Sequence, residues 1–106
     1  MVRFEIDERQ PIYRQIMEAL IRQIACGYWP PGGKLPSIRE MAETARVNPN
    51  TVARAFQELE RTGLVDTRRG EGTFVTMDSK AIKDCREETA QAAWAEFLGK
   101  IRELGF

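Results

Sequence analysis

Apolar residues recur at the three- and four-residue spacing of an amphipathic helix near the start of the chain, between Pro11 and Ala25. The apolar positions of this stretch are Ile12, Tyr13, Ile16, Met17, Leu20, Ile21 and Ile24. Proline suits the first turn, where a missing N–H costs nothing, and Gly27 suits the end of the helix. The pattern predicts a helix with one broad buried face.

Capping residues define the starts of two further helices. Ser37 followed by Glu40 forms a capping box, so a second helix begins at Ser37. Arg46 and Val47 make a turn, after which Asn48 offers a side-chain oxygen to the first N–H groups of a third helix and Pro49 fits its first position. The core residues predicted on these two helices are Ile38, Met41, Ala42, Ala45, Val52, Ala55, Phe56 and Leu59.

Two short strands are predicted after Gly63, which suits the end of the third helix. Residues 64–68 and 73–76 carry β-branched and aromatic side chains around a Gly-rich tip at residues 69–72. A helix, a turn, a second helix and then a hairpin form a winged helix-turn-helix, whose commonest use is to place the second helix in the DNA major groove. We therefore expect a mainly α fold with a small β-wing.

A last helix is predicted over residues 78–104, where proline is absent and alanine is frequent. The small winged domain closes around its own core, so this helix has little to pack against and we expect a partner subunit to cover it. Its predicted dimerisation residues are Ala90, Ala93, Trp94, Phe97, Leu98, Ile101 and Leu104. The alternative for Trp94 and Phe97 is the lining of a small-molecule pocket. The domains predicted are residues 1–77 for DNA binding and residues 78–106 for dimerisation.

The loop between the first two predicted helices, residues 28–34, contains two prolines and two glycines and cannot continue a helix. Trp29 within it is interpreted as a plug over the core, with ligand binding as the alternative.

Composition excludes several classes of protein. Sixteen basic residues balance sixteen acidic ones, so overall charge lends no support to nucleic-acid binding. No apolar run approaches the ~18 residues of a membrane span, and acids occupy the N-terminus where a signal peptide carries its apolar stretch. We expect a cytoplasmic protein without a membrane partner.

The chemistry of the side chains argues against an enzyme. The chain has no histidine, the commonest general base, and no nucleophile motif or phosphate-binding glycine loop. Cys26 and Cys85 are far apart in sequence and no CxxC occurs, so we expect no metal site, no redox pair and no cofactor. Both cysteines are predicted to be reduced packing residues.

The exposed positions of the second and third helices are candidates for DNA contact. Asn50, Thr51 and Arg54 lie near the start of the third helix, and these residue types can bond adenine, a phosphate or thymine, and guanine respectively. Ser37 and Arg39 lie at the positive end of the preceding helix, which favours a phosphate. The alternative is that these polar residues form only a solvated face.

The wing offers a second set of candidates. Arg68, Arg69 and Gly70 could reach the minor groove or its phosphates. Glu71 repels phosphate, so we expect a wing that contacts the backbone and does not insert among the bases.

Together these motifs resemble the GntR family of bacterial transcription regulators, and most closely its short-tailed YtrA branch, over about residues 4–76. The resemblance rests on Pro11-Ile12-Tyr13, Pro31-Gly32-Gly33-Lys34-Leu35-Pro36-Ser37-Ile38-Arg39-Glu40, Val47-Asn48-Pro49-Asn50-Thr51-Val52, Arg54-Ala55-Phe56, Glu58-Leu59-Glu60, Gly63-Leu64-Val65 and Arg69-Gly70-Glu71-Gly72-Thr73.

The resemblance implies a homodimer that binds a palindromic double-stranded DNA operator, usually as a repressor released by a small-molecule effector. It places DNA contacts on Ser37, Arg39, Asn48, Asn50, Thr51, Arg54, Arg69 and Gly70. Two other functions remain open: a protein-interaction module anchored by Trp29, Trp94 and Phe97, and a ligand sensor whose dimer cleft binds a small apolar compound.

Overall fold

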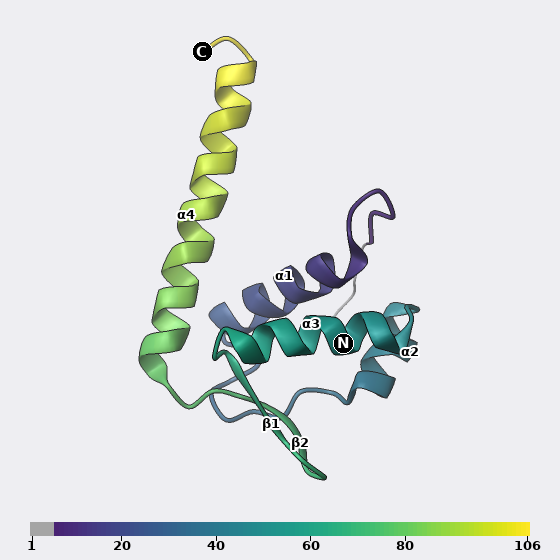
Figure 1. Cartoon of the computed structure of the whole chain (residues 1–106). Coiled ribbons are helices and arrows are strands. Elements are labelled where there is room, and N and C mark those ends of the chain that lie inside the picture. The colour runs from purple at the N-terminus through teal and green to yellow at the C-terminus, as the bar shows by residue number, and fades with distance from the viewer. Residues whose placement is uncertain (1–5) are drawn as a thin grey trace.

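A computed structural model describes residues 6–106, which form four helices and one antiparallel hairpin. The elements are α1 (Ile12–Ala25), α2 (Ile38–Ala45), α3 (Pro49–Arg61), β1 (Val65–Arg68), β2 (Gly72–Val75) and α4 (Ser79–Glu103). Figure 1 shows α1, α2 and α3 gathered into one body, the hairpin projecting from it and α4 extending away from it. The mainly α fold with a wing and a C-terminal helix is confirmed. Residues 1–5 of the predicted first domain lie outside the described residues.

The helix starts lie at the predicted capping residues. Ser37 Oγ accepts from the Glu40 backbone N–H at 3.0 Å, and Glu40 Oε1 accepts from the Ser37 N–H at 3.2 Å. Asn48 Oδ1 accepts from the Asn50 N–H at 2.8 Å, and Pro49 occupies the first turn of α3. Arg46 has a left-handed backbone with φ of 57°, which turns the chain between α2 and α3. The caps therefore fix where both helices begin. The buried residues of α3, Val52, Ala55, Phe56 and Leu59, set which face of the helix turns toward the core.

The core lies where α1 packs against α3 and the base of α4. Its fully buried side chains are Ile16, Leu20, Ile24, Leu35, Val52, Leu59, Val65 and Val75. All four apolar residues predicted for α3 are buried, and the predicted face of α1 contributes Ile16, Leu20 and Ile24 with partly buried neighbours. The two periodicity predictions that define the core are confirmed.

Two residues predicted to pack inside lie outside. Ile38 is 36% exposed, because it occupies the first turn of the short helix α2, beyond the edge of the core that Met41 and Ala42 reach. Cys26 is exposed because it caps the C-terminal end of α1 and lies past its buried face. The core prediction for Ile38 and the packing prediction for Cys26 were therefore wrong.

The loop after α1 returns along the wing. Val75 donates its N–H to the Gly33 carbonyl at 2.8 Å, and Leu35 donates to the Thr73 carbonyl at 2.9 Å, so the loop forms a short third edge beside β2. Trp29 is half-buried against the core, and its Nε1 donates to the Gln23 side chain at 2.6 Å. This contact fits the interpretation of Trp29 as a plug.

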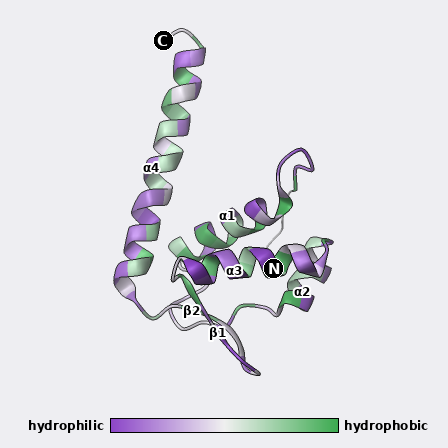
Figure 2. Ribbon diagram, viewed as in Figure 1, coloured by the Kyte–Doolittle hydropathy of each residue, from purple (hydrophilic) through white to green (hydrophobic). Residues whose placement is uncertain are grey.

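Helix α4 divides into two unlike halves. Its first turns carry Ile82 and Cys85 into the core, while the residues beyond Thr89 are exposed or half-buried. Figure 2 shows mostly hydrophilic residues in the first half and more apolar ones in the second. None of the helices in the described part of the chain has the length and apolar character needed to cross a membrane.

Candidate nucleic-acid interface

The N-terminal end of α3 presents polar side chains to solvent. Asn50 and Arg54 are exposed and Thr51 is half-buried. Val52, which is fully buried, anchors the opposite face of the same turns in the core. The candidate base-contacting residues therefore lie on an outward-facing ridge at the end of the helix that enters a major groove in related folds.

Arg54 has an aromatic neighbour on another helix. Its guanidinium carbon lies 3.8 Å from the centroid of the Tyr13 ring, a cation–π contact between α3 and α1. Sequence reasoning assigned Tyr13 to the buried face of α1 and missed this contact. Because the contact joins residues on two helices, helical spacing alone gave no signal for it.

The start of α2 combines a capping hydroxyl with an arginine. Ser37 Oγ accepts from the backbone of α2, which leaves its own O–H able to donate elsewhere. Arg39 is 88% exposed and forms a loose ion pair with Glu43 at 3.5 Å. Such an exposed pair is weak, so the guanidinium is available to a phosphate.

The capping box also ties down a negative charge near this surface. The hydrogen bond from the Ser37 backbone N–H, together with the Ser37 side chain, holds the pKa of Glu40 below its usual value. Glu40 is therefore a carboxylate at neutral pH, and it accepts the Ser37 N–H at the start of α2. Asn48 is committed in the same way, because its Oδ1 caps α3 and only its amide NH2 group is left for another partner.

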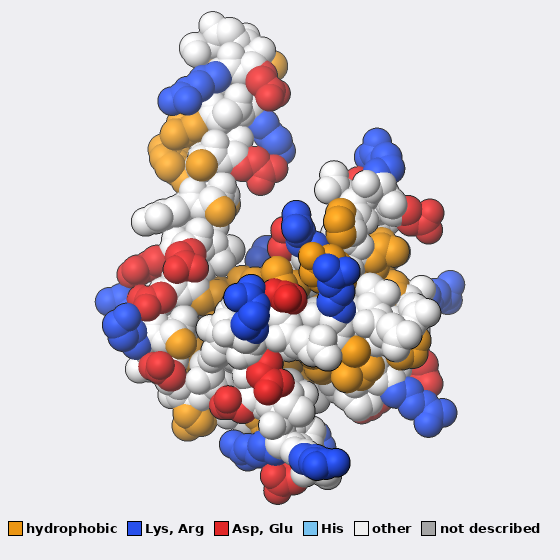
Figure 3. All heavy atoms as spheres, viewed as in Figure 1, with side chains coloured by type: hydrophobic (Ala, Val, Ile, Leu, Met, Phe, Trp, Pro, Cys, Tyr) orange, Lys and Arg blue, Asp and Glu red, His pale blue; other side chains and the backbone are white. Residues whose placement is uncertain are grey.

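The wing presents Arg69 and Gly70 at its exposed tip, beside Glu71. Gly70 has φ of 79°, a left-handed conformation that glycine adopts without strain. Arg68 lies with its guanidinium 4.4 Å from the centroid of the Phe74 ring. Figure 3 shows basic and acidic side chains mixed at this tip, so its charge is not purely positive.

The far half of α4 carries a separate apolar surface. Trp94 is 62% exposed, Phe97 53% and Leu104 71%. The rings of Trp94 and Phe97 stack with centroids 5.8 Å apart and planes 23° from parallel. Figure 3 shows hydrophobic side chains on the side of α4 that faces away from the rest of the molecule. Of the other predicted dimerisation residues, Ala90 and Ala93 are exposed and Leu98 and Ile101 half-buried.

Comparison with known proteins agrees with this architecture. Residues 12–75 match the family model for bacterial regulatory proteins of the gntR family. The chain is 37% identical over 101 residues to the HTH-type transcriptional regulator YhcF of Bacillus subtilis (strain 168), covering 95% of this chain and 84% of that relative. It is 45% identical over 78 residues to the HTH-type transcriptional repressor YtrA of the same strain, covering 72% of this chain and 60% of YtrA.

Solved structures show the same relationship. A GntR family transcriptional regulator from Listeria monocytogenes superposes with a TM-score of 0.87 at 36% identity, covering 94% of this chain and 88% of that chain. The AraR DNA-binding domain in complex with operator ORX1 superposes with a TM-score of 0.62 at 28% identity, covering 72% of this chain and 93% of that chain. The resemblance found in the sequence motifs is confirmed: the chain belongs to the GntR family and is a DNA-binding transcription regulator, not an enzyme.

Proposed function

We propose that the protein is a cytoplasmic repressor that binds a palindromic operator as a homodimer. The observation that carries this proposal is the outward-facing polar ridge of α3, held by a capped start and a left-handed turn. The name of the relative YtrA, a transcriptional repressor, supports the direction of regulation. Two copies related by a two-fold axis would present two α3 helices to half-sites about one turn of DNA apart.

In this proposal the DNA contacts divide into two kinds. Asn50, Thr51 and Arg54 reach base edges in the major groove. Phosphate contacts come from Ser37, Arg39, Asn48, Arg69 and Gly70. The exposure of Arg39 and Arg69 supports the second group, because an arginine without a strong partner loses little on meeting a phosphate.

The homodimer is assigned to the apolar surface of α4, in the proposed tail of residues 78–106. Large apolar side chains standing together in water favour association. The exposure of Trp94, Phe97 and Leu104 supports this assignment.

The proposal is tested by selecting duplexes from a random-sequence pool with the full chain and measuring binding by gel shift across a salt series. Arg69→Ala should weaken binding to all sequences alike and reduce the salt slope by about 1. Asn50→Ala should cost about 1–3 kcal/mol at a single base pair and relax preference there. Equal affinity for selected and scrambled duplexes would contradict sequence-specific binding.

A second candidate function, a small-ligand sensor, is favoured by a groove between α1 and α4. The open groove has a volume of about 710 Å³, and its lining includes the apolar residues Ile21, Leu64 and Cys85 and the acidic residues Glu18 and Glu88. A ligand there would contact both α1 of the winged domain and α4. It would therefore change the angle at which the two copies of the proposed dimer present their α3 helices to the DNA. Thermal shift against a metabolite panel tests it: a compound that raises the melting temperature and weakens operator binding supports a sensor.

A further inference from the structure

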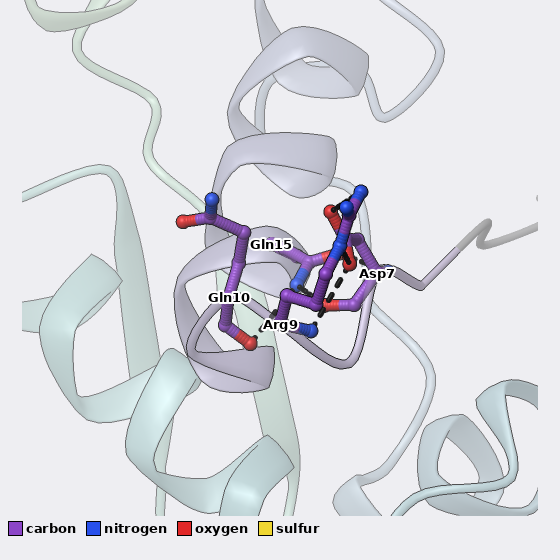
Figure 4. A network of polar contacts seen from close by, with 4 residues as sticks. All are labelled: Asp7, Arg9, Gln10 and Gln15. Carbon is purple, nitrogen blue, oxygen red and sulfur yellow. Dashed lines mark hydrogen bonds and ion pairs between the residues drawn. The ribbon is translucent and has the colours of Figure 1, made fainter.

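Tyr13 occupies a fixed place on the first turn of α1. The Gln15 side chain anchors this turn, because its Nε2 donates to the carbonyl oxygens of Asp7 at 2.6 Å and Gln10 at 3.2 Å, and its Oε1 accepts from the Asp7 N–H at 2.8 Å (Figure 4). Tyr13 itself is half-buried beside the core residue Ile16 in the next turn. The ring is therefore partly enclosed at the start of α1, and it lies against Arg54 of α3.

Among the described residues, Arg54 contacts this ring and no acidic side chain. Its guanidinium carbon stands 3.8 Å above the ring centroid, and no ion pair or hydrogen bond joins Arg54 to another side chain among residues 6–106. Stacking uses the flat face of a guanidinium, whereas its N–H donors lie in the plane and point outward from the rim. The contact restrains the side chain, and no described side chain accepts a hydrogen bond from its N–H donors.

We propose that Tyr13 is a positioning residue for base recognition, one that aims the Arg54 donors at the O6 and N7 acceptors of a guanine in the major groove. This inference rests on the proposed DNA contact by Arg54. A long arginine side chain loses conformational freedom when it binds. Because the ring restricts that freedom before DNA arrives, less is lost on binding, and a bidentate contact that needs a fixed plane forms more readily.

The test compares four forms of the full chain: the parent, Tyr13→Leu, Arg54→Ala and the double variant. The probe is the duplex most enriched when the parent selects from a random-sequence pool, together with copies in which each G·C pair in turn is replaced by A·T. Tyr13→Leu should weaken binding by about two- to five-fold, the size of an exposed cation–π contact, and reduce discrimination at one G·C position only. In the Arg54→Ala background the same substitution should cause no further loss.

Two variants separate this role from simple packing. Tyr13→Phe keeps the ring and should bind within about two-fold of the parent, while Arg54→Lys keeps the charge but not the planar donors and should lose discrimination at the same base pair. Tyr28→Leu removes a 51% exposed tyrosine from the loop after α1 and should leave binding unchanged. Circular dichroism melting checks that each variant is folded. If Tyr13→Leu does not fold, Arg54→Lys provides the test instead. Discrimination at that base pair equal to the parent's would then overturn the inference.

The outcomes distinguish the inference from the function on which it rests. If Arg54→Ala weakens binding and Tyr13→Leu does not, the inference is overturned and the proposed function stands. An equal effect of Tyr13→Leu with and without Arg54 also overturns it, because the ring then acts by another route. If Arg54→Ala binds like the parent, both the proposed contact and the positioning role are overturned.

Discussion

Arg86 of α4 donates its Nε hydrogen to the carbonyl oxygen of Ala25, the last residue of α1, at 2.8 Å and across 61 positions of sequence. The last carbonyls of a helix lack partners within it, and a positive charge there is favourable to the helix dipole. This contact, with Ile82 and Cys85 buried beside it, sets where the tail helix leaves the winged body.

Arg86→Ala should therefore lower the free energy of unfolding by about 1–2 kcal/mol, because a partly buried carbonyl loses a charged donor. Urea unfolding followed by circular dichroism measures the change. Lys83→Ala, at an exposed position one turn earlier on α4, is the matched control and should change stability by less than about 0.5 kcal/mol. Equal changes in the free energy of unfolding for the two substitutions would show that the Arg86 contact does not stabilise the fold.

The proposed dimer surface is tested by Phe97→Glu. A charge beside the stacked Trp94 ring would be buried in the dimer, so the variant should be monomeric at concentrations where the parent is dimeric. Light scattering after size exclusion gives the mass of each. Ala95→Glu adds the same charge at an exposed site on the other side of the helix, two residues away, and should stay dimeric. A parent that is monomeric at every concentration would contradict the homodimer.

The capping box predicts a pH dependence of stability. The Ser37 backbone N–H bonds the Glu40 carboxylate and lowers its pKa in the folded state, so the stabilisation is complete above the usual pKa near 4.5 and is lost as the pH falls through the folded value. Glu40→Gln should be less stable than the parent at neutral pH, and the difference should shrink toward zero in acid. Thermal melts of both proteins from neutral pH to about pH 3 measure it; a difference that stays constant would contradict the assignment.

The wing should respond unequally to changes at its two glycines. Gly72 has φ of 127°, a backbone conformation that residues with a side chain rarely adopt, so Gly72→Ala should cost about 1–2 kcal/mol. The added Cβ would lie 2.8 Å from Lys34 Cε, but the end of that flexible side chain can move aside. Gly70 has φ of 79° and open space around it. Gly70→Asn should cost less, because asparagine tolerates the left-handed region. Urea unfolding measures the free energy of unfolding of both variants. A larger loss of stability for Gly70→Asn than for Gly72→Ala would contradict this prediction.

The two cysteines should differ in reactivity. Cys26 is exposed, whereas Cys85 is buried and its burial raises the pKa of the thiol, which lowers the thiolate fraction. Iodoacetamide at neutral pH should label one thiol of the folded protein, identified as Cys26 by mass spectrometry. Cys26→Ser should remain unlabelled until denaturant is added, and rapid labelling of that variant in the native state would contradict the burial of Cys85.

Local sequence signals determined the secondary structure with few errors. Ser37 with Glu40, and Asn48 with Pro49, fixed two helix starts because a cap is an interaction between residues two or three positions apart. Gly63 fixed the end of α3 for the same reason, and Leu64 there donates back to the Leu59 carbonyl at 3.1 Å. Helical periodicity then identified the buried face of α3 from Val52 to Leu59. Residue types on the opposite face suggested DNA contact, and motifs spread from Pro11 to Thr73 suggested the family.

Contacts between elements were decided only by the tertiary structure. The cation–π contact of Arg54 with Tyr13 and the hydrogen bond from Arg86 to Ala25 join distant segments, and periodicity within one helix carries no information about them. Ile38 was misplaced for a related reason, since its spacing matched the buried face of α2 but the core ends before it. Local spacing sets which residues share a face, because that follows from backbone geometry. What covers each face depends on how the elements pack, which is a property of the whole chain.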